Sequence, residues 1–350
     1  MRTMSDEWRA QQLEKLAEVE REIQRQTAQL EAELLEIKAG RVWRAVKPVR
    51  FEVPGRCGEG AFSPDGGELA VASGFEQTNF DPNGEVSVYS TQSGKCLRTW
   101  SFSAYRVVVV PTGSGEYVHA WYSQDGRPHP GDLTWCDPSG ERQALATGLE
   151  INRMIGTSTG CAAVTSDGDL LIMAGAEVSR ARRHIPAYNL ACEPGTGMLA
   201  AVGDGLVLMN KAGRVVAKAR DAVADHVVFL GPDRLVTLDD EGRATIWLHE
   251  GRRLLRAMSI DAALNVNRLI ALPRHNGILA PNRFTGQASL IWVNGQALQM
   301  VEPPKRVHGH DAWGSADGRL LAVTKPFNAF LPPAPAQVEI FPPEMVLVGG

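Results

Sequence analysis

Residues 61–73 read AFSPDGGELAVAS, and residues 85–100 read EVSVYSTQSGKCLRTW. The segment Ser63-Pro64-Asp65-Gly66 predicts a tight turn, because Pro presets φ, Asp bonds its own backbone and Gly accepts a positive φ. The run after this turn combines small and β-branched residues and fits a strand that is buried on both faces. Two more strands follow, separated by the turn Thr91-Gln92-Ser93-Gly94. The stretch therefore predicts one small antiparallel sheet.

The same order of strand and turn signals recurs along the chain, with a period of roughly 40 residues. The units cover residues 61–100, 107–146, 154–182, 188–218, 226–258, 269–301 and 312–341. This spacing is typical of four-stranded blades in a ring, so the sequence predicts an all-β fold with a single seven-bladed β-propeller over residues 41–341. Because the third unit is faint, six and eight blades remain alternatives.

The seventh unit lacks its last strand, and a candidate for it lies at the other end of the repeats. Residues 42–53 carry Val46, Val49, Phe51 and Val53 at mostly alternate positions. We expect this segment to complete the seventh blade, because such closure removes the two free sheet edges of an open ring.

The first unit, from Phe62-Ser63-Pro64-Asp65-Gly66 to Ser93-Gly94-Lys95-Cys96-Leu97, resembles a blade of the WD-repeat family. Gly309-His310, followed by Ala316-Asp317-Gly318, is similar to the start of another blade. The chain departs from the family because it lacks the terminal Trp-Asp pair, where Trp247-Leu248 stands in the fifth unit. The resemblance implies a divergent propeller that binds other proteins.

Composition agrees with a packed protein of the cytoplasm. The 350 residues are 44% hydrophobic and 22% charged, and the net charge of −4 offers no bulk attraction to nucleic acid or to an anionic membrane. The five cysteines are widely spaced without a Cys-x-x-Cys pair, which favours reduced core residues over disulfides or zinc. No apolar run reaches the length of a membrane span, and the N-terminus is too polar for a signal peptide.

Residues 1–40 predict a different element, a long amphipathic helix. No Gly or Pro occurs from Ser5 to Lys38, and apolar residues recur at steps of three and four. Four of them keep a heptad spacing typical of a coiled coil: Leu16, Ile23, Leu30 and Ile37. The helix either packs on the propeller or acts as a solvated spacer, or it docks a partner helix or a second copy of the chain. We favour docking, because a helix this long has no obvious intramolecular surface to cover.

Residues 342–350, PPEMVLVGG, form a C-terminal tail. Their Met-Val-x-Val run into Gly-Gly weakly resembles the opening of a formylglycine-generating-enzyme-like (sulfatase-modifying factor) module. That resemblance implies the start of an absent or cleaved domain. The alternative is an ordinary hydrophobic tail that docks on the ring.

Two long loops interrupt the repeat between the second and third strands of a blade. Residues 74–84 carry Phe75 and Phe80, and residues 325–336 carry Phe327 and Phe330. Because the first and seventh blades are neighbours in a closed ring, both loops should lie on one face, with residues 124–131 extending the same rim. Exposed aromatic side chains there are candidate protein-binding residues, unless the two loops pack on each other.

Signals for catalysis are weak. His308, His310 and Asp311 have the chemistry of a metal site, but their place at the start of a blade favours a structural role. Arginines between residues 180 and 183 fit a solvated outer strand better than a site for nucleic acid. An enzymatic propeller needs acids or histidines at the starts of its inner strands, and those positions read mostly as Val, Leu, Ala and Met.

The sequence thus predicts a non-catalytic scaffold or recognition subunit of a multi-protein assembly, with no catalytic residue, metal or cofactor. By analogy with degenerate propellers of bacterial multi-component systems, the assembly is a regulatory or defence-type complex. The predicted partners are proteins, bound through the N-terminal helix and the propeller rim, and self-association is an alternative. Nucleic acid and membrane are not predicted. The competing hypothesis is an enzymatic or ligand-binding propeller that uses the central channel.

Overall fold

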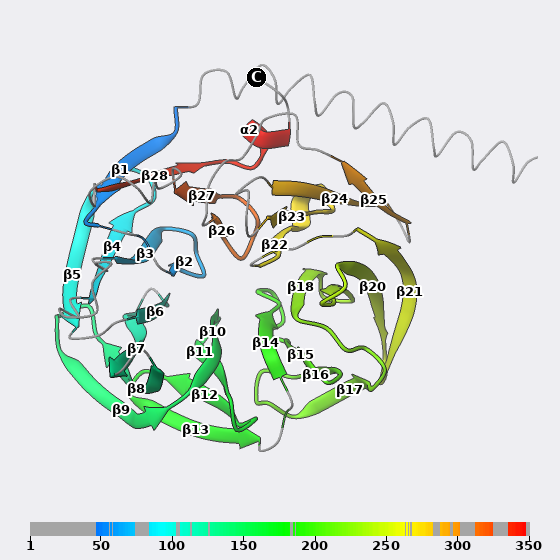
Figure 1. The fold of residues 1–350 in the computed structure, drawn as a ribbon, viewed down its shortest axis with the longest axis horizontal. Helices are drawn as coiled ribbons and strands as arrows, with labels where there is room; N and C mark the ends of the chain where they lie inside the picture. Colours follow the sequence, from blue (N-terminus) through cyan, green and yellow to red (C-terminus); the bar gives the residue numbers. More distant parts are fainter. Residues whose placement is uncertain are drawn as a thin grey trace, which may run out of the picture.

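The computed structural model describes residues 47–347, except residues 56, 58, 74–83, 103–105, 113, 125–126, 183–184, 186, 263, 265, 267, 283–287, 295–296, 302–311 and 325–334. The described part forms seven antiparallel four-stranded sheets around a common axis, which confirms the predicted seven-bladed propeller (Figure 1). The predicted helix of residues 1–40 lies outside the described residues.

The first four blades follow the chain without a gap in strand order. Blade 1 consists of β2 (Gly60–Phe62), β3 (Glu68–Ser73), β4 (Gly84–Ser90) and β5 (Cys96–Phe102). Blade 2 consists of β6 (Arg106–Pro111), β7 (Glu116–Gln124), β8 (Arg127–Cys136) and β9 (Arg142–Leu149). Blade 3 consists of β10 (Ile151–Thr157), β11 (Gly160–Thr165), β12 (Leu170–Ala174) and β13 (Glu177–Arg182). Blade 4 consists of β14 (Ala187–Cys192), β15 (Leu199–Gly203), β16 (Leu206–Met209) and β17 (Val215–Ala219).

The last three blades include the closure of the ring. Blade 5 consists of β18 (His226–Gly231), β19 (Arg234–Leu238), β20 (Arg243–Glu250) and β21 (Arg253–Asp261). Blade 6 consists of β22 (Ile270–Leu272), β23 (Gly277–Pro281), β24 (Ala288–Asn294) and β25 (Ala297–Val301), with the 3₁₀ turn η1 (Pro273–His275) after β22. Blade 7 consists of β26 (Ala312–Gly314), β27 (Leu321–Thr324), β28 (Ala336–Phe341) and β1 (Val49–Val53).

β1 closes the ring as the sequence predicts. It pairs antiparallel with β28, from Val49 opposite Ile340 to Val53 opposite Ala336. Within the described residues the strand begins at Val49, so residues 47–48 of the predicted segment are not part of it. The N-terminal strand thus supplies the outermost strand of the last blade, so the first and last parts of the propeller are joined in one sheet.

The core is distributed between neighbouring blades. The described buried residues form seven hydrophobic clusters, and each cluster joins two adjacent blades. Between blades 1 and 2, for example, Val88 of β4 belongs to the same cluster as Val107 of β6. The second strands are almost wholly buried, because a sheet covers each of their faces. This burial explains their runs of Ala, Val and Leu.

A buried side-chain hydrogen bond links two strands of blade 5. Trp247 of β20 donates its indole N–H to the hydroxyl of Thr237 in β19, at 2.9 Å, and both residues are buried. The bond ties the second strand to the third. The missing Trp-Asp pair therefore does not remove every polar link inside the blades.

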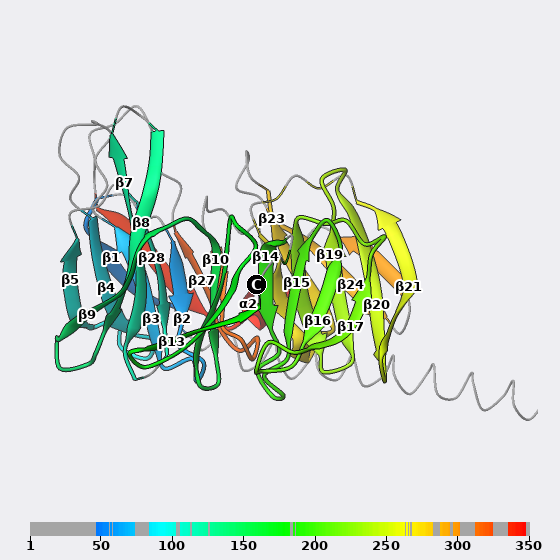
Figure 2. The same cartoon turned by 90° about the horizontal axis from the view of Figure 1, so that it is seen from below.

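Two expectations are wrong in detail. Residues 124–131 are not a rim loop, since Gln124 at the end of β7 pairs with Arg127 at the start of β8 in a hairpin that rises above the ring (Figure 2). The pairing of β8 with β9 begins at Gly131, so the prolines at positions 128 and 130 precede it and take no ladder bond from β9. Of the five free cysteines, Cys136 and Cys161 are buried as predicted, whereas Cys96 is exposed on an outermost strand.

The C-terminal tail contacts the ring. Residues Glu344–Leu347 form the one-turn helix α2, and Met345 packs against the cluster between blades 6 and 7. His275 pairs with Glu344 at 3.2 Å. These contacts support a docked tail, and the resemblance to a formylglycine-generating-enzyme-like module is not confirmed.

Candidate functional site

Five polar side chains gather where the innermost strands of five different blades begin. We call them the channel cluster: Glu59, Arg153, Asn189, His226 and Arg268. All inner strands start on the face from which the β7–β8 hairpin rises, because β6 runs antiparallel to β7. We call this side of the ring the entry face. The topology thus brings together residues that are far apart in the sequence.

Two β-bulges help to place the cluster. The register of β10 against β11 shifts between Ile151 and Arg153, and that of β14 against β15 shifts between Ala187 and Asn189. Each bulge adds one residue to the inner strand and changes the direction of the residues that follow. The extra residue Asn152 donates its side-chain amide to the carbonyl of Ala187 at 3.2 Å, which links the two bulges across neighbouring blades.

Four members of the cluster have direct partners. Arg268 forms an ion pair with Glu59, with 3.2 Å between Nη2 and Oε2, and the two side chains are 12% and 19% exposed. Asn189 Nδ2 lies 3.1 Å from His226 Nδ1. Since the Asn189 amide is the donor, His226 accepts on Nδ1 and bonds the backbone of Val266 with its other ring nitrogen.

Arg153 differs from the others. Its Nε atom is buried, and no hydrogen-bond partner for it occurs among the described residues. Burial lowers the pKa of Arg153, Glu59 opposes this shift, and Arg268 adds to it. The guanidinium nevertheless stays charged near neutral pH, because the ordinary pKa of arginine is above about 12. A buried cation without a hydrogen-bonded partner is costly, so this residue needs an explanation.

His226 carries no charge at neutral pH. Burial lowers its pKa to about 4, and the neighbouring charges of Arg153 and Arg268 act in the same direction. The described side chains of the cluster therefore contain two guanidinium groups, one carboxylate and a neutral imidazole. Their net charge is close to +1, although the whole chain is acidic.

The cluster opens into the central cavity, which measures about 280 Å³. Below the cluster the wall is mostly apolar and includes Phe62 and Trp313. The indole N–H of Trp313 is a second buried donor without a partner among the described residues. A Cβ on Gly60 would lie 2.7 Å from the Trp313 ring, so only glycine admits this indole beside β2. The cavity thus holds unsatisfied donors rather than unsatisfied acceptors.

The sequence reasoning missed this site. The expectation that inner strands start mostly with Val, Leu, Ala and Met left out the polar residues just before these strands, such as Glu59 before β2 and Arg268 before β22. One pattern in the sequence could have indicated the site. A polar residue recurs with the period of the blades, just before or within the apolar run of each inner strand. Glu59, His226 and Arg268 all occupy such positions.

None of the predicted binding residues is within the described part of the chain. They are Leu16, Ile23, Leu30 and Ile37 of the predicted N-terminal helix, and Phe75, Phe80, Phe327 and Phe330 of the two predicted loops. The strand ends that carry these loops are described. Ser73 ends β3 and Thr324 ends β27, and both lie at the entry face on neighbouring blades 1 and 7.

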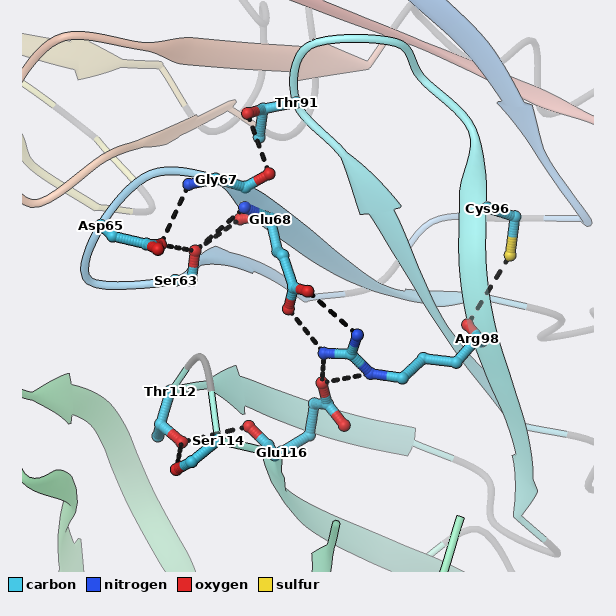
Figure 3. A network of polar contacts seen from close by, with 11 residues as sticks. Ser63, Asp65, Gly67, Glu68, Thr91, Cys96, Arg98, Thr112, Ser114 and Glu116 are labelled. Atoms are coloured by element: carbon cyan, nitrogen blue, oxygen red, sulfur yellow. Dashed lines mark hydrogen bonds and ion pairs between the residues drawn. The ribbon is translucent and has the colours of Figure 1, made fainter. Parts of the chain in front are cut away.

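A second arginine cluster lies at the opposite face, between blades 1 and 2 (Figure 3). Arg98 of β5 donates from Nη1 and Nη2 to Glu68 of β3, at 3.0 and 2.5 Å. It also donates from Nε to Glu116 of β7 at 2.9 Å, and its Nη2 contacts the same carboxylate. The turn before Glu68 is fixed by Ser63, whose hydroxyl bonds Asp65 and accepts from the Glu68 amide.

Glu116 is the buried member of this second cluster, with a side chain that is 0% exposed. Burial raises its pKa to about 7, and Arg98 opposes the shift. Burial alone would lower the pKa of Arg98, but its bonds to Glu68 and Glu116 raise it overall. Every guanidinium nitrogen of Arg98 is used, so this cluster is a structural link between blades.

The outermost strand of blade 3 carries a solvated charged group, as the sequence predicts for the arginines between residues 180 and 183. Arg180, on the outermost strand of blade 3, pairs with Asp169 at 3.1 Å and is 48% exposed. No group of three or more metal-binding side chains occurs in the described ranges, and no described helix is long and apolar enough to cross a membrane. The residues His308, His310 and Asp311 lie outside the described residues.

No family model matches the chain, and no curated protein matches it in sequence. Among solved structures, it is similar to the β-propeller domain of Cps50 (Swd1) from Myceliophteria thermophila, with 8% identity, a TM-score of 0.58 and coverage of 84% of this chain and 99% of that one. A chain of a mitotic checkpoint complex gives 17% identity, a TM-score of 0.55 and coverage of 85% and 95%. A putative 6-phosphogluconolactonase from Bacteroides fragilis gives 12% identity, a TM-score of 0.52 and coverage of 70% of this chain and 82% of that one. At these identities the likeness supports the propeller fold alone.

Proposed function

We propose that the chain is a non-catalytic recognition or scaffold subunit that binds a protein partner on the entry face. The observation that carries the proposal is that several surface features share this face. The channel cluster opens there, and the strand ends that bear the two aromatic loops lie there. The opposite face presents the short turns that join first to second strands and third to fourth strands.

Exposed apolar side chains on the same face support a protein partner. Tyr188 lies at the bulge of β14 and is 57% exposed, and Val223 lies between blades 4 and 5 and is 60% exposed. These are the two most exposed large apolar side chains in the described part of the chain. Aromatic residues beside a polar pocket are typical of the centres of protein interfaces.

The remaining parts of the proposal rest on the sequence and on analogy. The apolar stripe Leu16, Ile23, Leu30 and Ile37 provides a second docking element for a partner helix or another copy of the chain. One structural relative belongs to a mitotic checkpoint complex, which is a multi-protein assembly by its name. This analogy supports our proposal of a multi-protein assembly in the cytoplasm.

The test is affinity capture by the tagged full chain from a lysate of its native host, with mass spectrometry of the retained proteins. The doubly substituted variant Tyr188→Ser/Val223→Ser should lose a protein that the wild type retains. The matched control is Leu97→Ser/Leu255→Ser, because these apolar side chains are 47% and 40% exposed on outermost strands. The proposal fails if both variants retain the same proteins as the wild type.

Two further full-chain variants test the remaining docking elements in the same experiment. Phe327→Ser/Phe330→Ser should weaken partner binding and leave the melting temperature almost unchanged, because we expect these side chains to be exposed. A melting temperature lowered by many degrees would show that they belong to the core. Leu16→Ser/Ile23→Ser should release whatever binds the N-terminal helix.

The second candidate function is binding or conversion of a small ligand in the central cavity. The specific observation in its favour is the combination of a neutral His226 with a carboxylate and two guanidinium groups in one cavity. Native mass spectrometry of the protein purified from its host tests this idea. A small molecule retained by the wild type and lost from Arg153→Met would favour this second function over the first.

A further inference from the structure

We propose that the channel cluster is a carboxylate-binding site that receives an Asp or Glu side chain from an acidic segment of the partner protein. This inference rests on the proposed function, since it names the chemistry by which the entry face recognises its partner. Arg153 is the residue that binds the carboxylate, and Arg268, held by Glu59, contributes a second positive charge.

The hydrogen-bonding state of Arg153 indicates a missing acceptor. Its buried Nε has no partner among the described residues, whereas the guanidinium of Arg98 at the opposite face is bonded on all of its nitrogens. Arginine presents its donors in a planar fork that matches both oxygens of a carboxylate. An inserted carboxylate would therefore satisfy the Nε donor that the described residues leave open.

The charge of the cluster selects the kind of anion. Arg153 and Arg268 supply two positive charges, Glu59 supplies one negative charge, and His226 is neutral. One monovalent anion balances the remaining charge, whereas a dianionic phosphate would leave an excess negative charge in a cavity of low dielectric.

The other members of the cluster orient the site rather than bind the anion. The side-chain amide of Asn189 is occupied on both sides, since its oxygen accepts from the Leu190 amide at 2.8 Å and its nitrogen contacts His226. His226 is in turn bonded to the backbone of Val266. Within the channel cluster, the buried donor with open hydrogen-bonding capacity among the described residues is therefore the Nε of Arg153.

The position of the cluster favours a side chain of a larger partner over a free anion. The exposed ring-bearing residue Tyr188 directly precedes Asn189 in the chain, so an apolar contact surface borders the charged opening. An acidic residue flanked by apolar residues would use both features at once. The acidic net charge of the chain elsewhere also disfavours non-specific attraction of anions.

The experiment uses the purified full chain and three probes: the peptide acetyl-Gly-Glu-Gly-amide, its Gln counterpart and inorganic phosphate. Binding is measured by calorimetry and by the rise in melting temperature with probe concentration. We expect the Glu peptide to bind the wild type, and the Gln peptide to bind it at least about tenfold more weakly. The variant Arg153→Met should bind the Glu peptide at least about tenfold more weakly than the wild type does. The control Arg214→Met, an exposed arginine without a side-chain partner among the described residues, should bind like the wild type.

The variant Arg153→Met must melt at or above the wild-type temperature, so that lost binding is not a loss of folding. Arg153→Lys keeps the charge without the planar fork and should give an intermediate affinity. Equal binding of the Glu and Gln peptides, or unchanged binding on Arg153→Met, would overturn the proposal. Binding of phosphate without binding of the Glu peptide would overturn it as well.

The outcome is separable from that of the proposed function. The peptide experiment needs no cellular partner, and the capture experiment tests Tyr188 and Val223, which are not part of the channel cluster. If the Glu peptide binds but Tyr188→Ser/Val223→Ser captures the same proteins as the wild type, the carboxylate site is supported and the docking face is rejected. If that variant loses a captured protein but the Glu peptide does not bind, the docking face is supported and the carboxylate site is rejected.

Discussion

Arg98 lies on the outermost strand of its blade and Arg153 on the innermost strand of another, and the two have opposite surroundings. Arg98 lies between blades 1 and 2 and bonds two carboxylates, one of them fully buried (Figure 3). Arg153 lies in the channel, and its buried Nε has no partner among the described residues. The free energy of a buried charge depends on its partners, because desolvation costs several kcal/mol that only good hydrogen bonds offset. The difference separates an arginine that holds the fold from one that is available for binding.

The largest effect should follow from removal of the partnered arginine. Arg98→Met leaves Glu116 buried and without the cation that pairs with it among the described residues, so we expect a loss of about 3–5 kcal/mol in the free energy of unfolding at pH 8. Urea denaturation of the full chain measures it. The double variant Arg98→Met/Glu116→Gln should recover most of the loss, because no charge then remains buried. A cost below about 1 kcal/mol would mean that the cluster is not structural.

The pH dependence of stability gives the next effect. Burial raises the pKa of Glu116 from 4.5 to about 7, so the folded state binds more protons than the unfolded state between these values. The free energy of unfolding should therefore fall as the pH rises from about 4.5 to 7 and level off above, by an amount on the order of 1–3 kcal/mol. The difference between the wild type and Glu116→Gln in denaturation curves across this range isolates the contribution. A flat difference would contradict the raised pKa.

Arg153, whose buried Nε has no partner among the described residues, should respond in the opposite direction. Arg153→Met replaces a buried cation by an apolar chain of similar length, so we expect the free energy of unfolding to rise by about 1 kcal/mol at pH 7. Thermal and urea unfolding of the ligand-free protein measure the change. A clear loss of stability would show that Arg153 has a structural partner, and the comparison with Arg98 would then fail.

The smallest effect should come from an exposed arginine on the closing strand. Arg50 of β1 bonds Glu339 of β28 at 2.8 Å, but its side chain is 57% exposed. Because exposed ion pairs contribute little, Arg50→Met should change the free energy of unfolding by less than about 0.5 kcal/mol. A larger loss would indicate that ion pairing, rather than strand pairing and burial, holds β1 in place.

Much of the fold was predictable from the sequence because its signals are local. The turn that contains Pro64, Asp65 and Gly66 is fixed by bonds within a few residues, and the same pattern at Ser315 and Asp317 marks blade 7. Apolar runs with regular spacing then predict the number of blades, since each inner sheet must be covered on both faces. The closing strand was predictable for a related reason, because a ring with an incomplete last blade needs an outer edge.

The candidate site was not predictable in the same way. Glu59 and Arg268 form an ion pair across 209 positions of the chain, and no local pattern records that they meet. The bulges before Arg153 and Asn189 displace these residues by one position, which a search for alternating strands does not detect. Only closure of the ring brings the starts of the inner strands to one opening.

The sequence by itself determined the all-β class and the strand that closes the ring, and it favoured seven blades, because turn chemistry and burial patterns act within each unit. Tertiary structure alone decided which arginine is paired. Arg98 and Arg153 each lie on a strand of an ordinary blade unit, and nothing local separates them. Desolvation and partner geometry are set by neighbouring blades, and these make Arg98 part of the framework and leave Arg153 open to a ligand.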